Sequence, residues 1–178
     1  EGARLGAALL AGHAPAHPDS LCRGEVTSDM FIPGAEVMRA CTHEEVTKED
    51  LGGAHTHTSG SGVAHRSFAD EAACLEGLRE LLSFLPQNNR EDPPRHPTRD
   101  PAARADPELD RLIPAEPSRP YDMKDLVARV VDDGHLFEIQ PEYAPNIVVG
   151  FALLAGQPGG IVANPPIPLA GCLAVAAS

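Results

Sequence analysis

The strongest hydrophobic pattern lies in residues 68–85, where apolar side chains recur at steps of three and four. This spacing places the apolar positions on one face of a helix. Pro86 then ends the helix, because proline cannot continue it. We therefore predict a helix over 68–85 whose buried stripe consists of Ala72, Leu75, Leu78, Leu82 and Leu85.

Three shorter helices follow from weaker signals. Residues 35–41 have room for one or two helical turns. Thr47 begins a second helix, since Asp50 three residues later resembles the reciprocal partner of a capping box, and Gly52-Gly53 ends it. Residues 121–131 restore helical spacing, so a third helix is predicted there.

Strand patterns occur at both ends of the chain. Residues 27–32 form a short strand candidate that ends at a Pro-Gly turn. Residues 146–154 and 159–163 are apolar and flank turn-forming residues at 155–158, which predicts a hairpin of two buried strands. Asn164-Pro165-Pro166 ends that hairpin.

The remaining segments are less regular. Residues 55–62 are rich in Ser, Gly and His and predict a polar, flexible loop. Residues 86–120 carry many prolines and charges, which is typical of an extended connector between domains, with a short apolar patch at 109–113. Residues 169–177 are small and apolar and predict the start of a buried helix. Helices and strands on either side of a connector indicate α/β material from two neighbouring domains.

Charge narrows the classes of partner. The chain has 14 basic and 26 acidic residues, for a formal net charge of −12. Few positive charges are available to neutralise phosphates, so neither nucleic acid nor an anionic membrane surface is expected as a partner. Apolar runs are short or are broken by Pro and Gly, and we expect no transmembrane segment.

The cysteines are scattered and form no C-x-x-C pair, so zinc and redox motifs are not met. Cys74 lies in an amphipathic stretch and Cys172 in a small apolar one. Buried free thiols are therefore the simplest interpretation, and a reducing compartment agrees with it.

The residue types in the 55–65 region are compatible with two kinds of side-chain chemistry. His55, His57 and His65 could contribute to a metal site, but no carboxylate or fourth ligand is fixed beside them. Ser59 or Ser61 could act as a nucleophile with a nearby histidine, although the full G-x-S-x-G element is missing. We predict neither a metal site nor a catalytic side chain, and expect these residues to bind backbone or substrate.

Glycine pairs are candidates for close backbone approach. The exposed N–H groups of Gly52-Gly53 and Gly159-Gly160 could bind an oxyanion or a thioester carbonyl, or the glycines could simply satisfy backbone geometry. Asn164-Pro165-Pro166 makes a rigid corner after a strand, which is where ligands often lie in α/β folds. A structural turn is the alternative at each position.

Six strings in one order carry a family resemblance. From Glu25 onward the chain resembles the carboxyltransferase β subunits of propionyl-CoA carboxylase and related biotin-dependent acyl-CoA carboxylases. The strings are TSDMFIPGAEVM (27–38), EEVTKEDLGGAHTHTSGSGVAHR (44–66), LRELLSFLPQNN (78–89), PYDMKDLV (120–127), FEIQPEYAPNIVVGFALLAGQPGGIVANPP (137–166) and LAGCL (169–173).

The resemblance implies a crotonase-like α/β fold, a β-β-α spiral, with parts of two domains. Residues 1–118 would be the C-terminal part of the N-terminal carboxyltransferase domain, with 1–24 unmatched and 86–118 as connector. Residues 119–178 would begin the C-terminal domain. Family subunits pair across a dimer and assemble as a hexamer.

The implied reaction moves CO2 from carboxybiotin to the α-carbon of propionyl-CoA. Biotin would ride on an α subunit or carrier domain, and ATP would be used by that biotin carboxylase partner. The location would be the bacterial cytoplasm or the mitochondrial matrix. The resemblance assigns the acyl-CoA and biotin end of the site to Asn164, Pro165, Gly171 and Gly160, and the N-domain site loop to Gly52, Gly53, His57 and His65.

Several positions depart from the family pattern. The glycine-rich oxyanion element expected before Glu25 is not found in residues 1–24, and the second such element would lie beyond Ser178. Pro165 stands where the family has Gln, and Ala174 where it has an acidic residue. The chain alone is therefore expected to be inactive in carboxyl transfer. Alternatives are a carboxyltransferase for acetyl-, methylcrotonyl- or glutaconyl-CoA, a methylmalonyl-CoA decarboxylase, and a truncated fragment that only assembles with carboxylase subunits.

Overall fold

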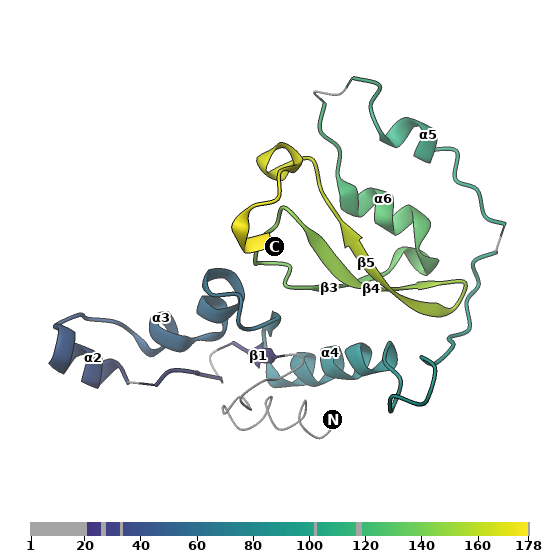
Figure 1. Cartoon of the computed structure of the whole chain (residues 1–178). Coiled ribbons are helices and arrows are strands. Elements are labelled where there is room, and N and C mark those ends of the chain that lie inside the picture. The colour runs from purple at the N-terminus through teal and green to yellow at the C-terminus, as the bar shows by residue number, and fades with distance from the viewer. Residues whose placement is uncertain (1–20, 26–27, 33, 102, 117–118, 178) are drawn as a thin grey trace. The chain divides into compact units, whose positions relative to one another are not determined.

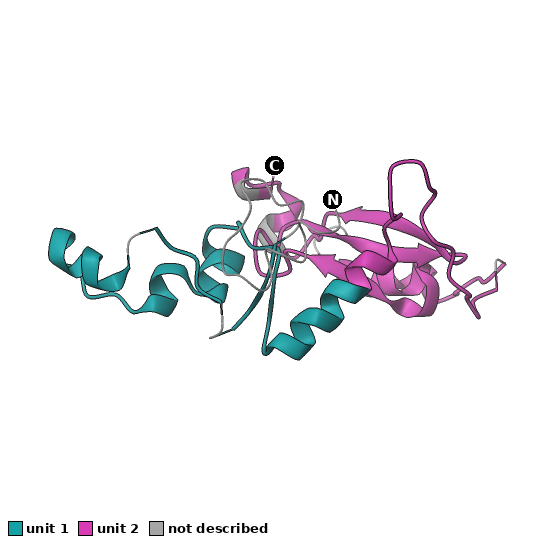
Figure 2. Ribbon diagram, turned by 90° about the horizontal axis from the view of Figure 1, so that it is seen from below, with its two compact units in different colours: residues 1–79 teal, residues 80–178 magenta. Residues whose placement is uncertain are grey.

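The computed structural model describes residues 21–25, 28–32, 34–101, 103–116 and 119–177. The chain divides into two compact units, Glu1–Arg79 and Glu80–Ser178 (Figure 2). The boundary between them falls inside helix α4 (Glu71–Ser83). The domain division expected at 118/119 is a separate matter, and it stays a prediction.

Unit 1 is small and mixed. Strand β1 (Cys22–Gly24) pairs in parallel with β2 (Arg66–Phe68), and neither strand was predicted. Its helical elements are α2 (Ala35–Thr42), α3 (Lys48–Gly52), the π-helical turn η1 (Thr56–Gly60) and the first part of α4. Buried Leu21 and Ala64 form a core against which Met30 packs.

The start of α3 confirms the predicted capping box. Thr47 Oγ1 accepts from the N–H of Asp50 at 3.1 Å, and Asp50 Oδ2 accepts from the N–H of Thr47 at 3.4 Å. Each side chain therefore satisfies a main-chain donor that the helix leaves without a partner. Gly53 caps the other end, as expected, through its N–H to the carbonyl of Glu49.

Two predictions in unit 1 were wrong. Residues 28–32 form no strand, because this segment is held by single contacts such as the N–H of Met30 to the carbonyl of Gly52 at 2.8 Å. Residues 55–60 are helical and not a loop, since they include η1, so only residues 61 and 62 of the predicted loop are irregular. The hydroxyl groups of Thr58 and Ser59 donate to the carbonyls of Ala54 at 3.1 Å and His55 at 2.7 Å, so polar side chains support the turn from within.

Unit 2 is built on an antiparallel sheet in the order β3-β4-β5 (Figure 1). Its helical elements are α5 (Leu109–Leu112), α6 (Met123–Val130), and the 3-10 turns η2 (Asp132–Gly134), η3 (Pro168–Gly171) and η4 (Val175–Ala177). The strands are β3 (Leu136–Ile139), which was not predicted, β4 (Val148–Leu154) and β5 (Gln157–Ala163). The helix predicted at 121–131 is confirmed by α6.

The predicted hairpin is confirmed by β4 and β5, with Val148 opposite Ala163 and Leu154 opposite Gln157. Its turn is tighter than expected. Only Ala155 and Gly156 connect the strands, with φ of 51° and 76°, which is the backbone of a two-residue turn that matches strand twist.

Both faces of the sheet carry hydrophobic clusters. Side chains of a strand point alternately to its two faces. One face packs Ala152 against Val127 and Val131 of the α6 region. The other packs Phe137 and Phe151 against Leu81 and Phe84. The ring centroid of Phe84 lies 6.0 Å from that of Phe137 and 5.8 Å from that of Phe151.

The helix predicted at 68–85 exists as α4, but its buried face was assigned wrongly. The buried residues are Cys74, Gly77, Leu81 and Phe84, whereas Ala72 is exposed and Leu82 is 41% exposed. The two stripes are neighbours with the same spacing. Periodicity identifies the helix, and the partner surface decides which stripe is covered.

The end of unit 2 is more exposed than predicted. No residue of β5 is buried, so only β4 is a buried strand of the hairpin. Residues 169–177 form 3-10 turns instead of a buried helix, and Val175 is 94% exposed. Cys172 is exposed, contrary to expectation, while Cys74 is a buried free thiol as predicted.

The connector has no helix or strand among its described residues except α5, at the predicted apolar patch. It belongs to unit 2 and is hydrogen-bonded to the helix and the hairpin of that unit, so it is not simply a spacer. Across the part of the chain that the structure describes, no helix is long and apolar enough to span a membrane.

Candidate functional site

The site predicted at the end of β5 is a corner held by side-chain amides. Asn164 follows the last residue of β5, and its Nδ2 donates to the carbonyl of Gly171 at 2.7 Å. Gly171 has φ of 78°, a conformation that glycine adopts without strain. Pro165 is buried beside the exposed Asn164. The structure therefore brings Asn164, Pro165 and Gly171 together, and their part in ligand binding stays a prediction.

Asn146 belongs to the same corner and was not singled out in the sequence. Its side chain is 3% exposed, and Nδ2 donates to the carbonyl of Cys172 at 3.1 Å. Two asparagines thus hold consecutive carbonyls, those of Gly171 and Cys172. One signal in the sequence could have identified Asn146: it is a polar residue at the start of an apolar run. A polar amide that is buried with such a run needs a hydrogen-bond partner.

A small cavity of about 180 Å³ lies nearby in unit 2. The loop between β3 and β4 lines it together with both strands, through Ile139, Gln140, Tyr143, Ala144, Ile147 and Val149, and Ala177 completes it. Gln140 and Ala144 have φ of 53° and 50°, which is uncommon for residues other than glycine. Polar and apolar atoms line the cavity in similar measure, and none of its side chains is charged, so it can accept a small uncharged group.

Gly160 lies apart from this corner. It sits on β5 opposite Phe151, and a Cβ atom there would meet nothing within 4 Å. Its backbone is therefore accessible. The residue makes no part of the Asn164–Gly171 contact, so a role in binding stays a prediction.

In unit 1 the structure joins Gly52 and His57 through one segment. A Cβ atom on Gly52 would lie 2.4 Å from the carbonyl oxygen of Met30. His57 Nε2 donates to that same oxygen at 2.8 Å. Gly53 is a helix cap, where a Cβ atom would lie 2.1 Å from Glu49 Oε1. These residues shape local backbone, whatever else they bind.

His57 also contacts Ser61, the serine considered as a nucleophile. Because Nε2 donates to a carbonyl, Nδ1 is the acceptor, and it takes the hydroxyl of Ser61 at 3.0 Å. Ser61 is exposed and lies in a surface turn. The pair fastens η1 to Met30. Among the described residues, no group of three His, Cys, Asp or Glu side chains could hold a metal ion.

His65 is separate from that group and supports the strand pair. The ring Nδ1 of His65 accepts from the main-chain N–H of Leu21 at 3.1 Å. The main-chain N–H of His65 donates to the carbonyl of Leu21 at 2.7 Å. Burial lowers the pKa of His65, because the charged ring loses water. The neutral ring is therefore the form that fits beside β1.

This pKa shift predicts acid sensitivity. A histidine in the unfolded chain has a pKa near 6.5, and the pKa of His65 in the folded chain is lower. As the pH falls, the unfolded state therefore binds this proton first. The stability contributed by His65 is present above about pH 6.5 and is lost below it, down to the folded pKa. Denaturant unfolding between about pH 8 and pH 5 should show this loss.

His65→Asn is the test variant, because its side-chain oxygen can accept from Leu21. We expect a weaker pH dependence in that variant. His43→Asn, at the exposed end of α2, is the matched control and should keep the wild-type dependence. Equal pH dependence in both variants would contradict the assignment.

The fold and sites define a class of protein. The chain matches the carboxyl transferase domain family over residues 7–178, and it belongs to that family. The match includes residues 7–24, which the resemblance had left out.

The curated relatives agree with this family. The propionyl-CoA carboxylase beta chain of Roseobacter denitrificans is 45% identical over 93% of this chain and 32% of its own length. A biotin-dependent acetyl-/propionyl-coenzyme A carboxylase beta5 subunit of Mycobacterium tuberculosis is 48% identical over 96% of this chain and 33% of its own. Methylmalonyl-CoA decarboxylase subunit alpha of Veillonella parvula is 48% identical, with 93% and 33% covered. The chain spans about a third of the length of these relatives.

The solved structures confirm the predicted crotonase-like α/β fold. The 12S transcarboxylase, with methylmalonyl-coenzyme A and methylmalonic acid bound, superposes with a TM-score of 0.87 at 36% identity. The alignment covers 92% of this chain and 31% of that one. That protein is described as a hexamer assembly.

Proposed function

We propose that the chain is part of the carboxyltransferase component of a biotin-dependent acyl-CoA carboxylase. The reaction would move a carboxyl group from carboxybiotin to the α-carbon of propionyl-CoA and give methylmalonyl-CoA. The observation that carries this proposal is the joint match of sequence and fold to carboxyltransferases across residues 7–178. Relatives named for propionyl-CoA support the acyl group.

The corner at Asn164 suits uncharged ligands. The ureido ring of biotin and the amides of the CoA arm are neutral and carry both N–H and C=O groups. Asn164 is exposed and offers an uncharged amide, Pro165 gives a rigid support, and the cavity of about 180 Å³ is lined by no charged side chain. These properties fit both ligands, and Gly160 adds open main chain on β5.

The residues of this chain would then bind and orient. Asn164, Pro165 and Gly171 would hold the acyl-CoA or biotin end, while Gly52, Gly53 and His57 would keep the shape of the N-domain loop. His65 would keep β1 paired with the loop before β2. Carboxybiotin, when bound, supplies the carboxyl group. In this proposal no side chain forms a covalent bond to the substrate.

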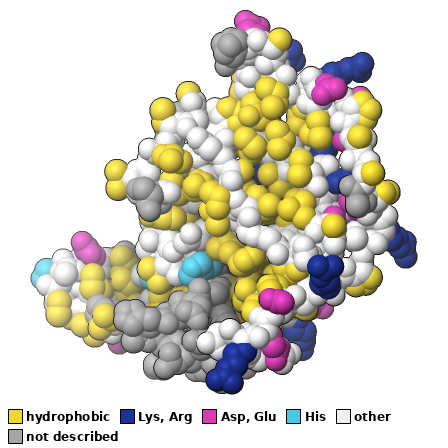
Figure 3. All heavy atoms as spheres, turned by 45° about the vertical axis from the view of Figure 1, so that its right-hand side comes forward, with side chains coloured by type: hydrophobic (Ala, Val, Ile, Leu, Met, Phe, Trp, Pro, Cys, Tyr) yellow, Lys and Arg dark blue, Asp and Glu magenta, His cyan; other side chains and the backbone are white. Residues whose placement is uncertain are grey.

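Partners follow from the same proposal. The described part of unit 2 leaves large apolar side chains in water, including Val162 at 71% and Leu173 at 60% exposure. Hydrophobic side chains also occupy much of the face in Figure 3. Exposed apolar surface of this kind marks interaction sites. We propose a homo-oligomer of such subunits, a hexamer in the intact protein, which binds a biotin-carrying α subunit that uses ATP. A bacterial cytoplasmic or mitochondrial matrix location would suit these partners.

A chimera tests the activity. Residues 7–178 would replace the matching segment of the Mycobacterium tuberculosis beta5 subunit. We expect the chimera to carboxylate propionyl-CoA with its α partner, and Asn164→Ala to raise KM by about tenfold. Gln157→Ala, exposed at the other end of β5, is the control. A hexameric chimera without transfer would refute the proposal, and a panel of acetyl-, methylcrotonyl- and glutaconyl-CoA would reveal another acyl preference.

A further inference from the structure

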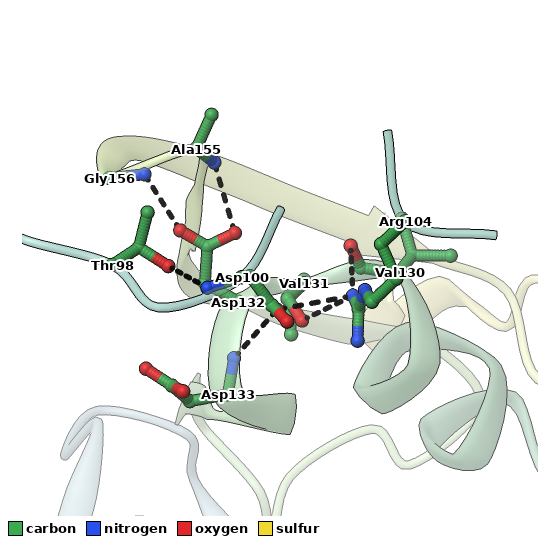
Figure 4. Close-up of polar contacts among 9 residues, drawn as sticks. All are labelled: Thr98, Asp100, Arg104, Val130, Val131, Asp132, Asp133, Ala155 and Gly156. Carbon is green, nitrogen blue, oxygen red and sulfur yellow. Dashed lines mark hydrogen bonds and ion pairs between the residues drawn. The ribbon is translucent and has the colours of Figure 1, made fainter. Parts of the chain in front are cut away.

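A buried carboxylate in unit 2 holds the turn between β4 and β5 (Figure 4). Asp132 follows α6 and is 6% exposed. Its Oδ1 accepts from the N–H of Ala155 at 3.0 Å, and its Oδ2 accepts from the N–H of Gly156 at 2.7 Å. Both oxygens of one side chain therefore bind consecutive amides of a two-residue turn. A charged acceptor makes such hydrogen bonds stronger than neutral ones.

A segment of the connector closes over the same turn. We call residues 96–101 and 103–106 the strap. The N–H of His96 donates to the carbonyl of Gly156 at 2.8 Å, and the hydroxyl of Thr98 donates to the Asp132 carboxylate. A Cβ atom on Gly156 would lie 2.2 Å from the carbonyl oxygen of His96. The strap thus lies directly against the backbone of the turn.

Charged side chains fasten the rest of the strap to α6. Arg104 donates to the carbonyls of Val130 at 3.2 Å and Val131 at 3.0 Å, which are last-turn acceptors that the helix itself does not use. Arg104 also pairs with Asp100 at 3.4 Å. The carboxylate of Asp100 accepts from the N–H of Asp133 at 3.2 Å. The strap is therefore hydrogen-bonded at several points to α6, η2 and the hairpin turn of unit 2.

A second ion pair lies further along the strap, where Arg129 donates to Asp106 at 2.8 Å. It connects α6 to the chain just before α5. With the contacts of His96 at the other end, it fixes the strap at both of its ends. The turn, the helix end and the strap are consequently one polar cluster.

The register of β5 depends on this turn. Leu154 faces Gln157 at the turn, and Val148 faces Ala163 at the far end, immediately before Asn164. A slip of one residue would move every side chain of β5 to the opposite face of the sheet. Packing restrains β5 only in part, because none of its residues is buried and only Ile161 and Ala163 pack against a buried cluster of unit 2. The turn is thus a further point at which the register can be fixed.

We propose that Asp132 is a positioning residue: together with the strap it fixes the register of the β4–β5 hairpin, and thereby the place where Asn164 leaves the sheet. The second half of this inference rests on the proposed role of Asn164 in acyl-CoA or biotin binding. The first half concerns the hairpin alone. The two halves have separate readouts.

Hydrogen exchange of the 178-residue chain tests the first half. Asp132→Asn keeps the shape of the side chain but places an NH2 group against the turn amides. We expect amides 155 and 156 to exchange at least about tenfold faster. Thr98→Ala is a milder variant that removes the hydroxyl contact with Asp132 and the hydrogen bond from the N–H of Asp100 within the strap, and it should give a smaller increase at the same amides. Asp92→Asn, an exposed carboxylate of the connector, makes the same charge change as the control.

Two results would overturn the hairpin half. One is exchange at 155 and 156 in Asp132→Asn that equals the Asp92→Asn control while both retain wild-type circular dichroism. The other, if Asp132→Asn does not fold, is wild-type exchange in folded Thr98→Ala.

Kinetics of the chimera test the second half. We expect Asp132→Asn to raise KM in the same direction as Asn164→Ala, and the double variant to be no worse than Asn164→Ala alone, because both act through one position. Additive effects, or a fall in kcat at unchanged KM, would refute positioning of Asn164. A chimera that lacks activity without any substitution would refute the proposed function, and the exchange result would still decide the hairpin half.

Discussion

Replacing Phe84 by alanine should lower the free energy of unfolding by about 3–5 kcal/mol, the usual cost of emptying a large aromatic site. Phe84 is 5% exposed and packs against Phe137 and Phe151, with Leu81 in the same cluster. These side chains cannot close the space of a lost ring without moving the sheet, because protein interiors are densely packed. Loss of ring–ring contact adds to the cost.

Leu82→Ala is the matched control for this experiment. Leu82 lies in the same stretch of α4 but is 41% exposed, so its truncation should cost less than about 1 kcal/mol. Denaturant unfolding followed by circular dichroism measures both variants. The comparison also tests which face of the helix is buried. The periodic pattern assigned Leu82 to the core, whereas the structure buries Phe84. Equal losses in the two variants would contradict the packing described for unit 2.

Gly52→Ala should destabilise unit 1 by about 2–3 kcal/mol through overpacking. The added Cβ atom would lie 2.4 Å from the carbonyl oxygen of Met30 and 2.8 Å from Cδ1 of Phe31. The nearest obstacle is main chain, which cannot rotate away as a side chain would. The Met30 segment would have to move and give up its hydrogen bond to the carbonyl of Gly52.

Gly60→Ala is the control for this second experiment, because a Cβ atom at Gly60 would meet nothing within 4 Å. We expect near wild-type unfolding in that variant. Hydrogen exchange of amides 30 and 57 locates the effect, since the N–H of Met30 donates to the carbonyl of Gly52 and the N–H of His57 to that of Gly53. A Gly52→Ala chain as stable as Gly60→Ala would remove the steric explanation for a glycine at this position.

Some features follow directly from short-range chemistry. The box of Thr47 and Asp50, the helix of residues 121–131 and the hairpin at 148–163 all depend on residues a few positions apart. Local spacing determines such elements, because their hydrogen bonds close within them. The family resemblance has a similar origin, because it is carried by short stretches of contiguous residues.

Other features depend on residues that are far apart. The parallel pair β1–β2 joins residues 22–24 to 66–68, and neither segment has enough alternation to indicate a strand. At the end of α4, Leu81 is buried against Phe137, which is distant from it in the sequence. Asn146 and Asp132 gain their roles from carbonyls and amides of other segments.

The sequence by itself determined the family, the main helices, the β4–β5 hairpin and the corner at Asn164, because each is encoded by neighbouring residues. Only the tertiary structure decided which face of α4 is covered, and that residues 55–60 are helical. It also decided that the proline-rich connector packs on the rest of unit 2 through His96, Thr98 and Arg104. The reason is physical: local spacing fixes the hydrogen bonds within an element, whereas burial and side-chain partners exist only once distant segments meet.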